Sequence, residues 1–239
     1  MHPYYNDNRK KFRKEMNGFL SLIRKELEEK TGEDYTILIE KIWNVYQSGM
    51  LENFPYIGGD QSSGTHNLTG AFVFVAMGEV CRKEYGMTLE DWGYLTTLCY
   101  RRYFDKIPGW LAILAGKLFK KTRLVNKMLK MKDKKNAENA KKYPGSFETK
   151  TQQPTEECPA NYHTLVCPLA NFAKDYGYMD YMPYLCNLDY VMFERIQVPF
   201  YREHTCADGD GYCDFKMKAG APVNSSWPCH QLTEGDPLK

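Results

Sequence analysis

The stretch CPLANFAKDYGYMDYMPYLCNLDYVMFERIQVPFYREHTCADGDGYCDFKMK, residues 167–218, decides the fold of this chain. Apolar spacing predicts two short helices in it, at 169–176, where Gly177 ends the first, and at about 182–194. Segments 196–206 and 213–219 are rich in β-branched and aromatic residues, and the DGDG sequence at 208–211 reads as a turn between two strands. Two helices followed by a hairpin indicate an α+β arrangement.

The neighbouring sequence extends this pattern on both sides. The segments SFETKTQ (146–152) and NYHTLVC (161–167) predict two more strands, whereas residues 1–142 carry mainly helical spacing. Within that half, 68–81 predicts a centrally buried helix, 54–67 a loop, and the sequence after Pro108 one long helix; Thr88 is the expected N-cap of another. We therefore expect an α+β fold with a helical N-terminal half packed on a small antiparallel sheet that has two short inserted helices.

No polar linker separates the two halves, so a single domain over 1–239 is expected. Its parts are a mainly helical 1–142, a region of strands and short helices at 143–220, and a tail at 221–239.

Composition limits the class of protein. The chain is 43% hydrophobic and 26% charged, which is typical of a globular protein, and no apolar run has the length of a spanning helix. No signal peptide is recognised at the start, so a cytoplasmic location is expected, and the eight cysteines are interpreted as thiols. The oligomeric state is not predicted.

The charge is unevenly distributed. Between Lys117 and Lys142 there are eleven Lys or Arg residues and two acidic residues, while the whole chain has a net charge of only +2. Such a run is compatible with nucleic acid or an anionic membrane surface, but it is more often a solvated helix face. Because no RNA-binding signature or zinc finger accompanies it, we do not predict a nucleic-acid partner.

Cysteine and aspartate supply the candidate chemistry. Cys186 and Asp189 are three residues apart on a predicted helix and therefore share one face. A carboxylate placed beside a buried thiol needs a cation, a backbone amide or a catalytic role to offset its desolvation. The alternative is that Cys186 is a small apolar core residue, the commonest role of a free buried cysteine.

The predicted hairpin brings further thiols together. If the turn occupies 208–211, Cys206 lies opposite Cys213, and Cys167 ends an earlier strand. Thiolates and the nearby His163 and His204 are possible zinc ligands, but no tight pair such as C-x-x-C is present, so no metal is predicted.

Several short motifs resemble the L-2-amino-thiazoline-4-carboxylic acid hydrolase family. They are PYIGG (55–59), Cys167-Pro168, Leu185-Cys186-x-x-Asp189, Thr205, Gly209 and Cys213-Asp214-Phe215, spread over about residues 54–218. The resemblance implies addition of water to a ring carbon between nitrogen and sulfur, which opens the thiazoline to N-carbamoyl-L-cysteine without a cofactor. Cys206 and His204 depart from the family pattern, in which apolar or small residues are more usual.

The resemblance implies roles for particular residues. Cys186, Asp189 and Cys213 become the catalytic candidates, as nucleophiles or as the base that activates water. Cys167, Arg195, Arg202 and His204 become the candidates for binding a small-molecule substrate. The CDF segment is also similar to vinyl-reductase-type ligand-binding domains, so a non-catalytic module that binds a small molecule or a metal is the alternative.

Alternation along the last strand adds one geometric expectation. Cys213 and Phe215 should face one side of the sheet and Asp214 the other. We expect Cys167, Cys186 and Cys213 to converge under the helices, with Asp214 in a structural role.

Overall fold

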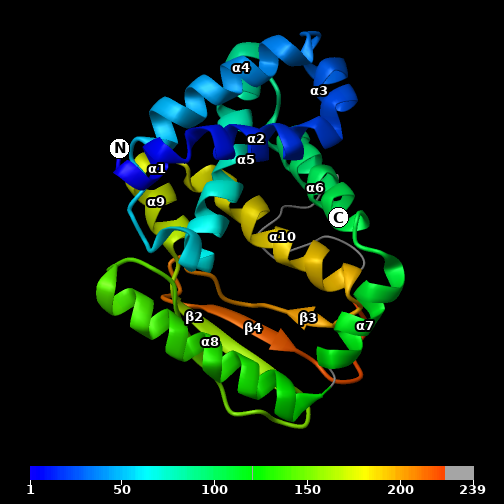
Figure 1. The fold of residues 1–239 in the computed structure, drawn as a ribbon. Coiled ribbons are helices and arrows are strands. Elements are labelled where there is room, and N and C mark those ends of the chain that lie inside the picture. Colours follow the sequence, from blue (N-terminus) through cyan, green and yellow to red (C-terminus); the bar gives the residue numbers. More distant parts are fainter. Residues whose placement is uncertain (120, 224–239) are drawn as a thin grey trace. The chain divides into compact units, whose positions relative to one another are not determined.

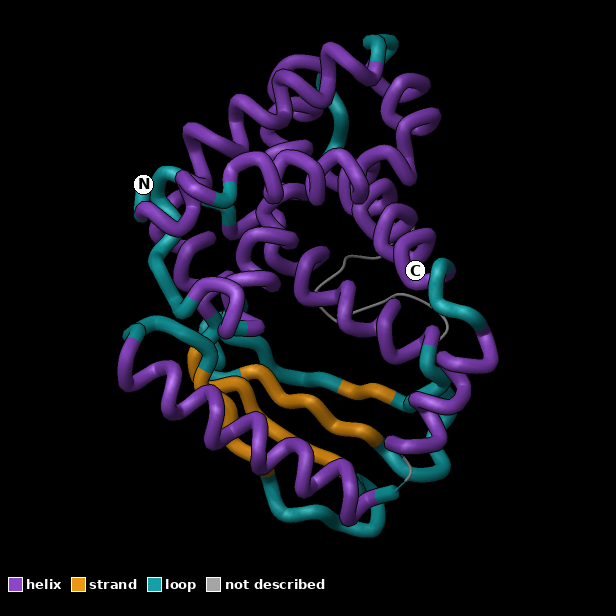
Figure 2. The backbone as a smooth tube through the Cα atoms, viewed as in Figure 1, coloured by secondary structure: helices purple, strands orange, loops and turns teal. Residues whose placement is uncertain are grey.

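A computed structural model describes residues 1–119 and 121–223 of the chain (Figures 1 and 2). The described chain divides into two compact units, with the boundary in the sequence between Tyr103 and Phe104. The first unit is helical, and the second contains a four-stranded antiparallel sheet together with helices. The fold is therefore α+β, with helices in the N-terminal half and the sheet in the C-terminal half, as the sequence predicts.

The first unit is built around one long buried helix. This helix, α5 (Ser63–Tyr85), buries residues on nearly every side, in agreement with its apolar sequence. The other elements are α1 (Pro3–Asp7), α2 (Arg9–Leu20), η1 (Ser21–Ile23), α3 (Arg24–Thr31), α4 (Tyr35–Val45), η2 (Tyr46–Leu51), η3 (Gly59–Gln61) and α6 (Leu89–Asp105), whose last two residues belong to the second unit. The backbone N–H of Asp91 donates to Thr88 Oγ1 at 3.0 Å, so Thr88 caps α6 as expected.

The loop predicted at 54–67 is shorter in the structure, because α5 begins at Ser63. Gly64 and Thr65 are buried in its first turn. Burial of that turn outweighs the low helix propensity of glycine and threonine, on which the sequence-based prediction relied.

The second unit alternates helices and strands. Its elements are α7 (Gly109–Phe119), α8 (Thr122–Lys142), β1 (Glu148–Thr151), β2 (Ala160–Val166), α9 (Pro168–Tyr176), η4 (Met179–Tyr181), α10 (Met182–Arg195), β3 (Phe200–Tyr201) and β4 (Cys213–Met217). The strands lie in the order β1-β2-β4-β3. The two inserted helices are α9 and α10, and Gly177 ends α9 in the left-handed conformation at φ 77°.

Two predicted elements differ from the structure. The single long helix after Pro108 is wrong, since Lys121 is non-helical and separates α7 from α8. The two helices face different partners: Gly116 of α7 lies against the carbonyl of Ile196, whereas α8 packs on β1 and β2. A single straight helix would not make both of these contacts.

The strand predicted at 196–206 is reduced to two residues. After Tyr201, the backbone N–H groups of Glu203 and His204 donate to Asp214 Oδ1 at 2.9 and 2.7 Å instead of joining the ladder. The N–H of Cys206 likewise donates to Cys213 Sγ, at 3.2 Å. Side chains of β4 therefore accept these N–H groups, although the Asp214 N–H still donates to the His204 carbonyl oxygen at 3.2 Å.

Both α8 and α10 lie against the same face of the sheet. Strand pairing puts Tyr162 beside Phe215 on this face, with their rings stacked at 4.5 Å. Phe200 of β3 lies 5.4 Å from the Phe215 ring and stacks on Phe193 of α10. Figure 1 shows the two helices running along the sheet.

The contact of α8 with this face is polar. Asp133 of α8 accepts hydrogen bonds from the hydroxyls of Thr149 and Thr151 on β1 and from the Thr151 N–H. Thr151 pairs with Tyr162 across the strands, so both threonines share the Tyr162 face. The two helices thus enclose a strip of sheet that holds the candidate site.

Candidate functional site

Arg202 is the centre of the site. Its side chain is only 2% exposed, and Nη1 donates to Asp189 Oδ2 at 2.8 Å. Nη2 donates to the carbonyl oxygen of Cys186, and the guanidinium carbon lies 5.4 Å from the Phe215 ring centroid. Burial opposes its charge, but Asp189 and the neighbouring thiols outweigh this and raise the pKa of Arg202. Arg202 therefore stays charged and fixes the position of the Asp189 carboxylate.

The Asp189 carboxylate is held in a fixed position and is also accessible to solvent. Its side chain keeps 36% of its surface exposed, although its partner is almost completely buried. The salt bridge leaves one carboxylate oxygen, Oδ1, outside the bond to Nη1. An oriented, reachable carboxylate of this kind can accept a proton from water or bind a polar substrate group.

Lys132 is a member of the site that the sequence analysis missed. Much of the residue is accessible to solvent, but its Nζ lies 4.5 Å from the centroid of the Tyr162 ring. Desolvation there lowers the pKa of Lys132, and the carboxylates of Asp189 and Asp133 oppose this shift in part. An ammonium group with a lowered pKa therefore lies close enough to Asp189 for their charges to interact.

Four thiols of the second unit, those of Cys167, Cys186, Cys206 and Cys213, differ in acidity. The hydrogen bond from the Cys206 thiol and the bond from the Cys206 N–H lower the pKa of Cys213, against the effect of burial, and raise that of Cys206. Burial raises the pKa of Cys167 to about 12, although the N–H groups of Ala170 and Leu169 oppose the shift. Burial also raises the pKa of Cys186, despite the nearby Arg202. Among these four, Cys213 is the thiol with the greatest thiolate character.

The three cysteines that we expected to converge do lie near one another. Cys167 and Cys213 are both close enough to Cys186 to raise its pKa. Cys213 shares a sheet face with Phe215, and it is this face that α10 covers. This agrees with the geometry expected from alternation along β4.

Asp214 lies on the opposite sheet face, and its contacts are structural. It is 1% exposed, receives the two loop N–H groups of Glu203 and His204, and forms an ion pair with Lys216 at 2.8 Å. Burial opposes its ionisation, but these hydrogen bonds outweigh it and lower the pKa of Asp214. The carboxylate anchors the loop that carries Arg202.

Two sequence-predicted binding residues make their contacts elsewhere. Arg195 donates to the carbonyl oxygens of Phe104 and Ile107 at the end of α10. His204 is directed to Asp210, with 3.4 Å between Nδ1 and Oδ2, and its ring lies near Tyr212. No contact in the described chain joins either side chain to Asp189, so their roles in substrate binding stay predictions.

Within the described residues, no three His, Cys, Asp or Glu side chains are grouped as a metal site would require. Over the same residues, none of the helices combines the length and apolarity needed to cross a bilayer.

Comparison with known proteins gives one finding. No curated protein and no solved structure matches the chain. The model of the L-2-amino-thiazoline-4-carboxylic acid hydrolase family matches residues 111–217. This segment contains all seven candidate site residues and Lys132, whereas the PYIGG motif at 55–59 lies outside it. The match over residues 111–217 supports membership of the L-2-amino-thiazoline-4-carboxylic acid hydrolase family.

Proposed function

We propose that this protein is a cofactor-independent hydrolase that opens a small cyclic substrate with adjacent C–N and C–S bonds, such as 2-amino-thiazoline-4-carboxylate. The observation that carries this proposal is a reachable carboxylate, Asp189, that acts electrostatically on the ammonium of Lys132, inside the segment that matches the hydrolase family. Hydrolysis of such a ring requires a base for water and an acid for the leaving sulfur.

The proposed reaction uses the two groups in turn. Asp189 takes a proton from water, the water oxygen forms a bond to the ring carbon between nitrogen and sulfur, and the π electrons of the C–N double bond pass to the ring nitrogen. The second proton of the added water moves to this nitrogen through solvent, so the oxygen can form the carbonyl when the ring opens. The C–S bond then breaks with its electron pair on sulfur, and the Lys132 ammonium protonates the sulfur to a thiol. The proton on Asp189 returns to the Lys132 amine through solvent, so the product, N-carbamoyl-cysteine, equals substrate plus one water.

The remaining candidates have supporting roles in this scheme. Arg202 holds the Asp189 carboxylate in a fixed orientation, and its buried Nε has no hydrogen-bond partner in the described chain. Cys167 and Cys186 line the site as neutral thiols, since burial raises the pKa of both. Cys213 has the lowered pKa that a covalent route through its thiolate would need.

Replacement of Asp189 tests the proposal. Asp189→Asn keeps the shape but removes the base, and we expect kcat to fall by about 10²-fold or more. Asp175→Asn, an exposed change on α9, is the matched control and should keep full activity. Ring opening is followed by titration of the released thiol. Unchanged kcat in Asp189→Asn would exclude this residue as the base.

The covalent route is distinguished by Cys213→Ser and by intact mass. If water attacks directly, Cys213→Ser loses less than about tenfold in kcat and no adduct forms on the wild-type protein. A substrate-derived mass on Cys213 that disappears in the serine variant would assign the nucleophile to that thiol instead.

A non-catalytic binding module is the second candidate function. It is favoured by the raised pKa of Cys167 and Cys186, because neutral thiols are apolar lining groups rather than nucleophiles. This candidate predicts stabilisation by thiazoline or hydantoin compounds in thermal-shift experiments without turnover. Stoichiometric zinc in the purified protein would favour it as well.

A further inference from the structure

Helix α7 has its large apolar side chains on the outside. The small residues Ala112 and Gly116 are buried, while Trp110 is 69% exposed. Four other large apolar residues of the same helix are also exposed: Leu111, Ile113, Leu114 and Leu118. A surface helix normally turns such residues inward, so this face has the composition of a binding surface.

The exposed apolar residues continue onto α8. Leu124, Met128 and Met131 follow one another at spacings of four and three, so they form one stripe, and all three are exposed. The buried face of α8 is a different one, formed by Val125, Leu129 and Asn136.

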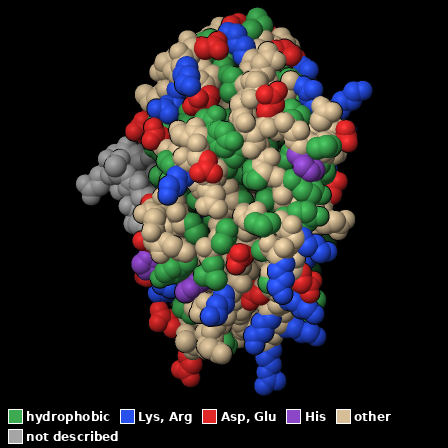
Figure 3. Space-filling model, turned by 90° about the vertical axis from the view of Figure 1, so that its left-hand side faces the viewer, with side chains coloured by type: hydrophobic (Ala, Val, Ile, Leu, Met, Phe, Trp, Pro, Cys, Tyr) green, Lys and Arg blue, Asp and Glu red, His purple; other side chains and the backbone are tan. Residues whose placement is uncertain are grey.

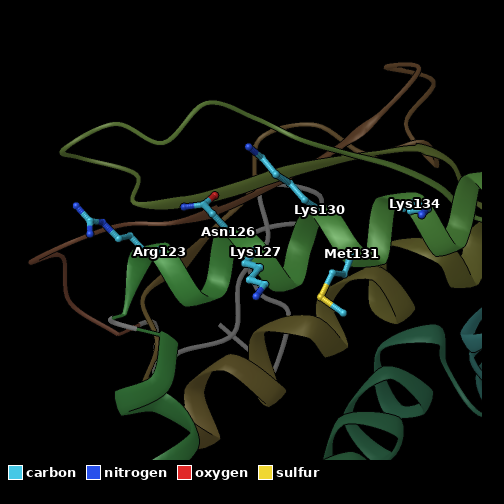
Figure 4. Close-up of a pocket in the computed structure, with 6 residues that line it drawn as sticks. All are labelled: Arg123, Asn126, Lys127, Lys130, Met131 and Lys134. Atoms are coloured by element: carbon cyan, nitrogen blue, oxygen red, sulfur yellow. The ribbon is translucent and has the colours of Figure 1, made fainter.

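A basic stripe runs beside the apolar one. Arg123, Lys127, Lys130 and Lys134 recur at spacings of three and four, and with Met131 they line a shallow groove along α8. Figure 4 shows Lys127 and Met131 extending to the same side of the helix. Lysine and arginine next to large apolar residues is the arrangement of helices that lie in the plane of a membrane surface.

Negative charge is missing from this part of the sequence. Residues 109–131 contain no Asp or Glu. Among the described residues, Lys117, Lys121, Arg123, Lys127 and Lys130 form no ion pair, so their charges are available to an outside partner. Figure 3 shows Lys and Arg side chains gathered in the lower part of the view, at the height of α8 in Figure 1.

We propose that these residues form a docking surface for an anionic lipid membrane, which we call the α7–α8 surface. It consists of Trp110, Leu111, Ile113, Leu114, Leu118, Leu124, Met128 and Met131 with the basic residues Lys117, Lys121, Arg123, Lys127, Lys130 and Lys134. The apolar side chains enter the boundary between headgroups and acyl chains, and the cations lie at the anionic headgroups. The protein binds reversibly on one leaflet.

Charge and apolarity together favour lipid over other occupants. A second copy of the chain in a symmetric pair would bring two basic stripes together, which is unfavourable. The phosphates of nucleic acid would pair with the cations, but they would make no favourable contact with the exposed apolar side chains of α7. A solvated helix face accounts for the lysines and leaves the exposed Trp110 unexplained.

Vesicle binding tests the proposal with the full-length protein. We expect co-sedimentation with vesicles containing about one third phosphatidylserine, little binding to pure phosphatidylcholine, and weaker binding at high salt. Lys127→Gln with Lys130→Gln should lower the partition coefficient about thirtyfold, since each cation near an anionic surface contributes roughly a factor of five. Trp110→Ser with Leu114→Ser should lower it at least tenfold.

The matched control changes the same charge at another place. Lys10→Gln with Lys14→Gln, on exposed positions of α2, removes two positive charges outside the surface and should bind as the wild type does. If the control lost as much vesicle binding as the α8 variant, net charge alone would explain the effect and the proposal would be overturned. It is also overturned if vesicles do not bind, if DNA or RNA binds through the lysines without dependence on Trp110, or if light scattering shows a dimer that Trp110→Ser dissociates.

Discussion

At the scale of single residues, Lys132 determines how the proposed reaction responds to pH. Desolvation lowers its pKa below the usual 10.5, so the proton needed by the leaving sulfur is lost earlier than from an ordinary lysine. Activity should therefore be full below this lowered pKa and fall as pH rises through it. The measurement is kcat/KM against pH, in which the alkaline limb should lie below pH 10.5.

Two variants of α8 test whether Lys132 causes the alkaline limb of the pH profile. Lys132→Gln removes the proton donor and should reduce kcat about 10²-fold. Lys134→Gln, an exposed neighbour on α8 with 81% side-chain exposure, should keep both the activity and the alkaline limb. If Lys132→Gln retains the wild-type profile, the proton donor is another group.

The lowered pKa of Asp214 leads to a prediction about how the free energy of unfolding depends on pH. Its pKa is lowered in the folded protein from the usual 3.8, so the stability it contributes is present above pH 4 and is lost as pH falls through the folded value. Asp214→Asn should lower the free energy of unfolding at pH 7 by roughly 2 kcal/mol, since charged hydrogen bonds to two amides and Lys216 are weakened. Urea denaturation at several pH values measures both effects. A variant that is as stable as Asp175→Asn at pH 7 would contradict the anchoring role.

Individual residues also show where sequence reasoning is sufficient. The placement of Cys213 and Asp214 on opposite faces follows from strand alternation alone. Lys132 was missed because it lies in a run of lysines that reads as a solvated face. A signal for it exists: it continues the spacing of Val125 and Leu129, which the structure buries, so it lies on the inner side of α8.

At the scale of elements, the contact of α7 with the turn after α10 depends on one missing side chain. A Cβ on Gly116 would lie 1.8 Å from the carbonyl oxygen of Ile196, a contact that only backbone movement relieves. Gly116→Ala should therefore destabilise the protein by about 2 kcal/mol, although alanine is the better helix former.

The same helix supplies the control for this change. At Gly109 an added Cβ meets nothing within 4 Å, so Gly109→Ala should leave stability unchanged or raise it by up to about 1 kcal/mol. Urea midpoints of the two variants provide the comparison. Equal midpoints would show that α7 does not rest on the Ile196 turn.

The elements that sequence predicts best are those set by local pattern. Both β1 and β2, as well as α9 and α10, appear within a few residues of their predicted positions. The short β3 was overestimated, because the side chain of Asp214, ten residues ahead of His204, takes the N–H groups that would continue the strand. Pairings over such separations are tertiary and leave no local signal.

At the scale of the whole molecule, the single domain predicted from the sequence can be tested by cooperativity. Trp43 and Trp92 lie in the first unit and Gly116 in the second. In a background with Trp110→Phe and Trp227→Phe, the fluorescence change on unfolding reports on the first unit. A single domain requires Gly116→Ala to shift this change to lower urea, in step with far-UV circular dichroism. An unshifted tryptophan signal would mean that the two units unfold separately.

The uneven charge also has a practical consequence for handling the protein. The segment from Lys117 to Lys142 carries a local charge of +9, so the rest of the chain carries −7, and the isoelectric point near pH 8.0 reflects cancellation between distant parts. At that pH the protein as a whole has no net attraction to either type of ion-exchange resin, yet α8 alone presents a cationic patch to a sulfonate matrix. Retention on a cation exchanger at pH 8, with elution by moderate salt, is the expected chromatographic behaviour.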